Sequence, residues 1–471
     1  MTPAAPWRLL DAGGLPIFRS AGLRAGAVWF YAPGYLALAA PAQAEAFAAG
    51  LSAGANPGGW ASPVAGELVH HAAEARRRWA EAEARPFAPV CLTLYLNNAC
   101  NLNCVYCYSS PRRPGRLTLD AVWPAARMVA ANCRAQGRPL VVVMHGGGEP
   151  ALDQRLADAL LTGLDDIARL AGVTVFRYIA TNGALSAARA RWLAERFDLI
   201  GLSCDGPEDV QTRQRPMAGG GASTPLVERT ARLVRAAGKP LHVRVTVTAD
   251  SLSRQAETAA YVCAQLKPQE VHVEPVYGAG GGADLSVSQA PEFVAEFVKA
   301  RAVARGYGVR WLTSGSRLED IHGAYCQVFR EVLHVVPGGA ATACFQTVDT
   351  AQARERALVI GAAAADGFSL DIARVETLRR QLRREPARCA GCFNRYHCAR
   401  GCPDHCPLSG IPEEPGFRCQ AGQGLTEARL QAAAKQLPAP AGSSGIVGAE
   451  VSELEDTGRA VDGEAYGSAG D

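Results

Sequence analysis

The chain has 471 residues, of which 48% are hydrophobic, and its formal net charge is +3. This length predicts two or three folding units, and the near balance of charge argues against nucleic acid or a membrane surface as partner. No run approaches the ~18 apolar residues of a membrane span. No secretory signal is evident either, so we expect a cytoplasmic protein. Fifteen cysteines in such a chain argue against disulfides and for metal or redox chemistry.

Residues 1–88 are expected to form an N-terminal appendage of mixed helix and strand. Residues 28–38 predict a hairpin that turns at Pro33-Gly34, and helices are expected at roughly 41–51 and 65–84. The edge of such a hairpin could capture a leader peptide by strand addition. A lid that packs on the following unit is the alternative.

A regular alternation of strands and helices occupies residues 89–310. Apolar runs predict strands at 91–96, 140–144, 173–180, 199–204, 241–248 and 270–276. Helical patterns are expected at 119–136, 152–170, 187–197, 225–237, 253–266 and 290–310. Six β/α repeats predict a parallel sheet with helices outside, and such folds place their chemistry on the loops after the strands.

Three cysteines with the spacing Cys-x3-Cys-x2-Cys, at Cys100, Cys104 and Cys107, lie on the loop after the first of these strands. Three thiolates on a short loop can hold three irons of a four-iron cluster and leave the fourth iron open to an outside ligand. A structural zinc site with a distant fourth ligand is the alternative. The motif resembles that of the radical S-adenosylmethionine (SAM) superfamily, whose cluster splits SAM into methionine and a 5′-deoxyadenosyl radical.

Later loops resemble the SAM-binding segments of the same superfamily. The run Gly147-Gly148-Glu149-Pro150 follows the second strand, and its glycines let the backbone approach a ligand. Asn182 closes the third strand, where a capping turn is the alternative reading. Ser203 and Asp205 end the fourth strand, in a Ser-x-Asp-Gly-Pro run. The resemblance implies a SAM site formed by Gly147, Gly148, Glu149, Pro150, Asn182, Ser203, Asp205 and Arg215, with Arg215 a candidate partner of the SAM carboxylate.

His272 and Glu274 on the sixth strand are candidate catalytic residues. They alternate with Val271 and Val273. If the valines pack against the helices, the two polar side chains point into the barrel, where substrate or adenosine would lie. A satisfied buried polar pair is an equal alternative.

Cysteines become dense again in residues 311–430. Their pattern resembles the SPASM extension, which binds two auxiliary four-iron clusters. The resemblance implies a distal cluster on Cys389, Cys392, Cys398 and Cys419. It implies a cluster nearer the active site on Cys326, Cys344 and Cys402. The fourth ligand of the nearer cluster could be Cys406 or a substrate thiolate, and a pair of zinc ribbons is the alternative. Residues 431–471 are expected to be a disordered tail.

Four other cysteines, Cys91, Cys133, Cys204 and Cys263, are expected in the core.

Taken together, the resemblance implies an α/β protein with a partial (β/α)6 barrel, an N-terminal appendage and a C-terminal SPASM domain. It implies three [4Fe–4S] clusters, SAM, and a reducing partner such as flavodoxin or ferredoxin. The implied activity is that of a radical SAM oxidoreductase that abstracts a hydrogen from a ribosomally made peptide and forms a thioether or carbon–carbon crosslink.

Three alternative functions follow from the same motifs. One is a sulfatase-type maturase that forms formylglycine. Such enzymes carry an Asp after the second SPASM cysteine, whereas Phe345 follows Cys344 here. Another is modification of a small molecule. The last is a non-catalytic electron carrier, but an electron carrier has no need of the SAM amino-group site implied by residues 147–150.

Overall fold

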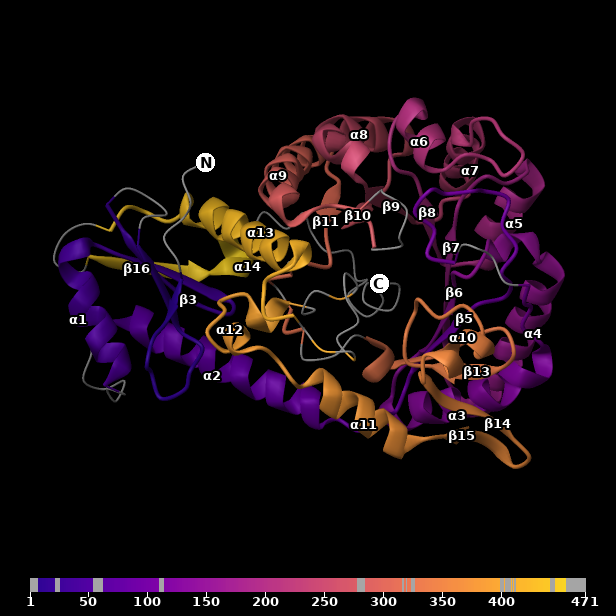
Figure 1. Cartoon of the computed structure of the whole chain (residues 1–471), viewed down its shortest axis with the longest axis horizontal. Helices are drawn as coiled ribbons and strands as arrows, with labels where there is room; N and C mark the ends of the chain where they lie inside the picture. Colours follow the sequence, from indigo (N-terminus) through magenta and orange to yellow (C-terminus); the bar gives the residue numbers. More distant parts are fainter. Residues whose placement is uncertain are drawn as a thin grey trace.

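The computed structural model describes residues 7–21, 26–53, 62–109, 114–277, 284–315, 317–318, 320–322, 327–398, 402, 408, 410, 412–440 and 445–454. Within these ranges the strands form two sheets, one at the N-terminal end of the chain and one in the barrel (Figure 1). Among the helices in these ranges, none combines the length and the apolar character needed to cross a bilayer.

The N-terminal unit is an antiparallel sheet packed between helices. Its strands are β1 (Arg8–Leu9), β2 (Phe18–Ala21), β3 (Val28–Ala32), β4 (Tyr35–Ala39) and β16 (Ile446–Glu450), in that order. The predicted hairpin is confirmed, with Gly34 at φ 98° in its turn. Alternate residues of β3 and β4 face opposite layers. One set packs on α1 (Pro41–Ser52) and α2 (Pro63–Ala84), and the other packs on α13 (Phe417–Ala434).

The C-terminal end of the described chain belongs to this N-terminal sheet. Strand β16 pairs antiparallel with β4 from Ile446↔Ala39 to Glu450↔Tyr35, and α14 (Val451–Leu454) follows it. The expectation of a disordered tail from residue 431 is therefore wrong for these residues and for the end of α13. Both long sides of the 28–38 hairpin are also occupied, by β2 and by β16, so the edge proposed for peptide capture is already paired.

The barrel contains the predicted strands and helices. Its parallel strands are β5 (Cys91–Leu94), β6 (Leu140–Met144), β7 (Val175–Thr181), β8 (Leu199–Ser203), β9 (Leu241–Val247), β10 (Glu270–Pro275) and β11 (Arg310–Leu312). The helices between them are α3 (Leu119–Gln136), η1 (Pro150–Leu152), α4 (Gln154–Ala171), α5 (Ala187–Arg196), α6 (Glu208–Gln214), α7 (Thr224–Ala236), η2 (Ala249–Arg254), α8 (Gln255–Tyr261), η3 (Val262–Leu266), η4 (Val287–Gln289) and α9 (Ala290–Gly306).

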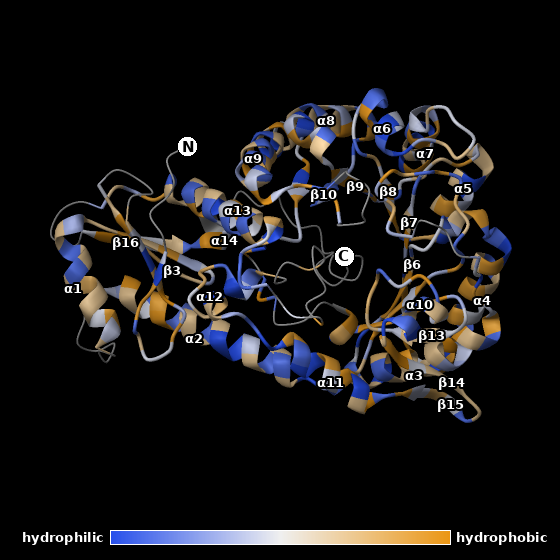
Figure 2. Cartoon of the chain, in the orientation of Figure 1, coloured by the Kyte–Doolittle hydropathy of each residue, from blue (hydrophilic) through white to orange (hydrophobic). Residues whose placement is uncertain are grey.

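Figure 1 shows the strands in an arc with the helices on the outside, as a partial barrel requires. The first strands of this arc are mostly hydrophobic, β9 and β10 alternate polar and apolar residues, and the helices mix hydrophilic and hydrophobic residues along their length (Figure 2). Strand β6, for example, is buried throughout because helices cover one face and the barrel interior lies on the other. The four cysteines expected in the core, Cys91, Cys133, Cys204 and Cys263, are all buried.

The barrel sheet continues into the cysteine-rich region. Strand β12 (Val332–Val335) runs parallel to β5, and β13 (Ala340–Thr342), β14 (Val359–Ala364) and β15 (Gly367–Leu370) extend the sheet beyond it. The boundary expected after residue 310 therefore cuts through one continuous sheet. The remaining helices are η5 (Gln327–Phe329), α10 (Thr350–Glu355), α11 (Ile372–Leu382), α12 (Ala387–Ala390) and η6 (Arg395–His397).

Candidate active site

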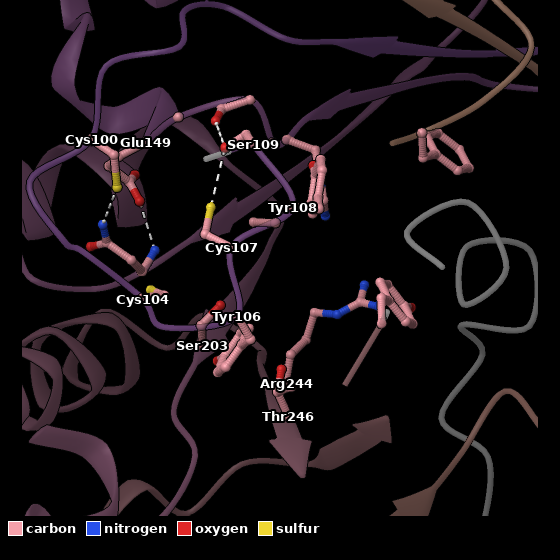
Figure 3. Close-up of a pocket in the computed structure, with 18 of the residues that line it drawn as sticks. Cys100, Cys104, Tyr106, Cys107, Tyr108, Ser109, Glu149, Ser203, Arg244 and Thr246 are labelled. Atoms are coloured by element: carbon pink, nitrogen blue, oxygen red, sulfur yellow. Dashed lines mark hydrogen bonds between the residues drawn. The ribbon is translucent and has the colours of Figure 1, made fainter. Parts of the chain in front are cut away.

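A cavity of about 290 Å³ opens at the carboxyl ends of the barrel strands. The loop after β5 and the loop after β6 line one side of it, and β9 and β10 line the other (Figure 3). Its lining includes Cys100, Cys104, Tyr106, Cys107, Tyr108, His145, Gly147, Gly148, Glu149, Asn182, Ser203, Arg215, Arg244, His272, Glu274, Tyr277 and Phe345. The structure thus gathers most of the site residues expected from the sequence around one cavity.

The three cysteines of the first loop share this cavity. Burial raises the pKa of the Cys104 thiol to about 11, and the adjacent Cys107 and Cys100 act in the same direction. The side-chain amide of Asn182 lies 3.6 Å from Cys100 Sγ, and the Ser109 hydroxyl lies 3.1 Å from Cys107 Sγ. The Ser109 hydroxyl donates its hydrogen to Gly147 O at 2.6 Å, so of these two groups the Asn182 amide is the one that directs a hydrogen at a cysteine sulfur. Hydrogen bonds to the sulfurs are a normal environment for an iron–sulfur cluster. These residues therefore fit a four-iron cluster with three protein ligands.

The glycine-rich loop after β6 lies directly against the cysteine loop. Glu149 N donates to Ala99 O at 2.7 Å, and Gly148 N donates to Asn97 O at 2.9 Å. A Cβ on Gly148 would lie 2.0 Å from Ala99 O, so no side chain fits at this position. Gly147 has φ 71°, a backbone conformation that favours glycine. The glycines are thus explained by the close approach of the two backbones beside the cavity.

Glu149 joins three segments behind the cavity. Its carboxylate accepts hydrogen bonds from Thr181 Oγ1 at 2.8 Å, Asn182 N at 2.7 Å and Ala151 N at 3.0 Å. Burial raises the pKa of this carboxyl group despite these bonds. The side chain therefore holds the end of β7 in place, and through it Asn182.

Asp205 is the centre of a second buried network. It accepts hydrogen bonds from Tyr106 Oη at 2.5 Å, Gln214 Nε2 at 2.8 Å, Arg215 Nε at 3.0 Å and Thr246 N at 2.9 Å. Its side chain is fully buried and does not line the cavity, whereas Tyr106 and Arg215 do. Asp205 therefore positions two cavity residues and does not itself line the cavity. Pro150, which is also expected in the SAM site, does not line the cavity either.

His272 and Glu274 face the cavity, as the alternation on β10 predicted. Glu274 accepts a hydrogen bond from Ser314 N at 2.7 Å and pairs with Arg418 at 3.3 Å. His272 Nε2 contacts Glu270 Oε1, and burial lowers the pKa of His272 below its ordinary value. Both side chains thus take part in buried polar contacts while they line the cavity.

The cysteine-rich region contributes one wall of the cavity. Tyr95 Oη donates to Phe345 O at 2.6 Å and lies 3.0 Å from Tyr108 Oη. Phe345 follows Cys344, so these two tyrosines connect the segment that carries Cys344 to the loop that carries Cys107. The region expected to hold an auxiliary cluster therefore begins at the cavity itself.

Four cysteines gather between α12 and α13, away from the cavity. Burial raises the pKa of the Cys392 thiol to about 12, and the neighbouring thiols of Cys398, Cys419 and Cys389 add to this rise. Gln423 Nε2 lies 3.5 Å from Cys392 Sγ and 3.7 Å from Cys419 Sγ. This set fits the four thiolate ligands of a closed iron–sulfur cluster.

The ligands expected for the nearer cluster are only partly visible. Cys344 and Cys402 lie within the described residues. Burial raises the pKa of the Tyr277 phenol, and Glu274 and, to a smaller extent, Cys402 act in the same direction, which places Cys402 near Tyr277. Tyr277 lines the cavity. Cys326 and Cys406 lie outside the described residues, so the choice between Cys406 and a substrate ligand stays a prediction.

Sequence reasoning missed one arginine in the cavity and another that pairs with a cavity residue. Arg244 on β9 reaches into the cavity (Figure 3), and Arg418 on α13 pairs with Glu274. The alternation of polar His242, Arg244 and Thr246 with valines on β9 was the available signal, since it matches the alternation noticed on β10. Nothing in the local sequence around Arg418 indicates its partner, because the contact depends on how α13 packs.

Comparisons with known proteins agree with this geometry. Residues 94–261 match the Radical SAM superfamily. Among solved structures, the chain is similar to hexahistidine-tagged anSMEcpe with bound AdoMet, at 17% identity and a TM-score of 0.61 over 74% of this chain and 96% of that one. It is also similar to Streptococcus suis SuiB bound to S-adenosylmethionine, at 14% identity and a TM-score of 0.50 over 82% of this chain and 97% of that one.

The chain therefore contains a radical SAM domain within the predicted α/β fold, and it is an enzyme. A domain of this kind works with a four-iron cluster and SAM, and the residues around the cavity fit both.

Proposed function

We propose that this enzyme is a radical SAM maturase that abstracts a hydrogen atom from a ribosomally made peptide and forms a thioether or carbon–carbon crosslink in it. The observation that carries the proposal is the composition of the cavity. Cys100, Cys104 and Cys107 line one side of it, and Phe345, next to Cys344, lines another. A radical generated at the first loop would thus arise within reach of the segment proposed to hold an auxiliary cluster.

The proposed site residues divide by role. Gly147, Gly148, Asn182, Ser203 and Arg215 would bind SAM, since they surround the cysteine loop. When bound and reduced, the cluster and SAM supply a 5′-deoxyadenosyl radical, which takes one hydrogen atom from the peptide. His272 and Glu274 line the side of the cavity opposite the cysteines and would contact the peptide.

The proposed overall change removes two hydrogen atoms from the peptide. One leaves as the hydrogen atom taken by the radical. The other leaves as a proton and an electron when the new bond forms, and the electron would pass to the auxiliary cluster beside Cys344. An external reductant such as flavodoxin or ferredoxin would supply the electron that starts each cycle.

A peptide substrate is supported by a similar solved structure. The similar structure of native anSMEcpe with bound AdoMet and Cp18Cys peptide, at 17% identity and a TM-score of 0.58 over 73% of this chain and 98% of that one, holds a peptide together with SAM. Formylglycine formation is disfavoured here because Phe345 stands where the sulfatase-type enzymes carry an Asp.

The test uses anaerobic, cluster-loaded protein with a reductant and SAM. The substrate is a short peptide encoded by a gene next to the gene of this enzyme. We expect 5′-deoxyadenosine and a peptide product lighter by two hydrogen atoms. Replacing Cys100, Cys104 and Cys107 together by Ala should abolish both, because these thiols are the proposed ligands of the catalytic cluster. Peptide oxidation that persists in this variant would count against the proposal. So would SAM cleavage by the wild type that gives no modified peptide with any of the peptides tested.

A further inference from the structure

Two histidines and a glutamate meet near the amino-terminal ends of β9 and β10. His242 and Glu270 are register partners across the two strands, and His272 lies two residues beyond Glu270 on the same face. Their side chains are 17%, 3% and 9% exposed, in the order His242, Glu270 and His272. All three are therefore carried by rigid neighbouring strands and are largely withdrawn from solvent.

The ligating atoms of these residues already converge. Glu270 Oε1 contacts His272 Nε2 and lies 3.8 Å from His242 Nδ1, and one ligating atom from each residue fits within 4.8 Å of the others. In a tetrahedral zinc site with bonds of about 2.0–2.1 Å, the donor atoms are ~3.3 Å apart. A small rotation of the side chains would bring the three atoms to that spacing around one ion.

The donor set is suited to a transition metal rather than to Mg²⁺ or Ca²⁺, which prefer oxygen. Burial disfavours the charged imidazolium, and it lowers the pKa of His242 to about 4. The other carboxylate oxygen, Glu270 Oε2, is paired with Arg310. Arg310 is half-exposed and contacts this oxygen, so it can orient the carboxylate as an outer partner while Oε1 faces the imidazoles.

We propose that His242, Glu270 and His272 bind a divalent transition-metal ion, with Zn²⁺ as the best match. Two imidazoles and one carboxylate are a known set of protein ligands for zinc, and they leave a fourth position for water or a small ligand. His272 also lines the cavity, so the ion would lie at the cavity floor, at the end of the strands opposite the cysteine loop. It would join β9 to β10 next to β11, the edge strand of the sheet.

The experiment uses the full-length, anaerobic, cluster-loaded protein, in which the cysteine sites are already filled with iron. The protein is dialysed against micromolar Zn²⁺, and zinc and iron are measured by mass spectrometry. We expect about one more zinc per chain in the wild type than in Glu270→Gln, at equal iron content. Zinc K-edge spectroscopy should show only nitrogen and oxygen neighbours at about 2.0–2.1 Å, whereas zinc in a cysteine site would show sulfur at about 2.3 Å.

Two further variants complete the test. His242→Gln changes the most exposed of the three ligands and should lose the zinc as well, which covers the case in which Glu270→Gln fails to fold. His70→Ala removes an exposed histidine of α2 and should keep it. Equal zinc in the wild type and in both ligand variants, or a sulfur-dominated zinc spectrum, would overturn the proposal. The measurement needs neither SAM nor peptide, so its result is separate from that of the activity test.

Discussion

Two buried carboxylates at the cavity hold other groups in place: Glu149, which lines the cavity, and Asp205, which lies behind the lining. Glu149 receives three hydrogen bonds from the ends of neighbouring segments, and Asp205 receives four. A buried carboxylate is costly unless it is bonded in this way, so each one fixes the groups that donate to it. The precision of the proposed SAM site therefore depends on these two carboxylates.

The first prediction concerns Glu149→Gln. The amide can accept only at its oxygen, so its NH2 group would face either Thr181 Oγ1 or Asn182 N, both of which are donors in the wild type. We expect a loss of about 1–3 kcal/mol in the free energy of unfolding and weaker SAM binding. Urea titration and equilibrium binding of SAM measure the two effects. Glu208→Gln, at the exposed start of α6, is the control and should change neither.

The second prediction concerns pH and His334. This residue of β12 is fully buried, with its ring 4.2 Å from that of Tyr95, and burial lowers its pKa to about 3. Below the ordinary histidine pKa of about 6.5 the unfolded chain binds a proton that the folded chain does not, so stability falls as the pH falls. Between pH 7.5 and pH 5 this one group should cost about 2 kcal/mol.

The measurement compares anaerobic urea midpoints at pH 7.5 and pH 5. His334→Leu removes the titrating group and should lose less stability between the two values than the wild type does. His70→Leu removes an exposed histidine and should follow the wild type. If His334→Leu and the wild type show the same pH dependence, the ring at position 334 is not the source of the loss.

At the scale of elements, α12 and α13 build the distal cysteine site together. Cys389 lies in α12 and Cys419 in the first turn of α13, and Cys392 and Cys398 flank η6 between them. The same region contains His397, whose Nε2 lies 2.7 Å from Tyr31 Oη and whose Nδ1 lies 2.7 Å from Asp320 O. The distal site is thus attached to the N-terminal sheet through His397.

The third prediction tests this site as a separate cluster. If three four-iron clusters assemble, the wild type should contain about twelve irons per chain after anaerobic reconstitution. Cys392→Ala should reduce this to about eight and leave SAM cleavage without peptide in place, because the thiols proposed for the catalytic cluster lie on another loop. Cys263→Ala, which replaces a core cysteine of η3, is the matched control and should keep the full iron content. A wild type with four irons and zinc would reject the auxiliary clusters.

At the scale of the whole molecule, the sequence predicted what is local and missed what is distant. The barrel strands and the motif loops follow from periodicity and spacing within short windows. By contrast, β12 pairs with β5 across more than two hundred residues, from Val332↔Cys91 to Val335↔Leu94, and no local pattern indicates that partner. The networks of Asp205 and Glu270 also depend on which strands become neighbours, so they were not visible in the sequence.

Strand β16 shows the same limit most clearly. Its residues, Ile-Val-Gly-Ala-Glu, include several with low strand propensity, and the segment around it is rich in small residues. Its place is nevertheless specific. A Cβ on Gly448 would lie 2.8 Å from the Tyr35 ring and 3.1 Å from Leu36 O, so a side chain at that position would require the Tyr35 ring to move. Val451, directly after it, is buried against the core beneath α13.

The last prediction follows from this placement. A chain that ends at Pro440 would leave β4, with the apolar sequence Tyr-Leu-Ala-Leu-Ala, as an unpaired edge strand. Exposed apolar edges invite pairing between molecules, so we expect a lower thermal midpoint and concentration-dependent aggregation, measured by anaerobic calorimetry and light scattering. A chain that ends at Leu454 keeps β16 and is the control. Because the cysteines lie upstream of both ends, iron content should match in the two chains before heating. Equal midpoints and equal scattering would show that β16 does not stabilise the sheet.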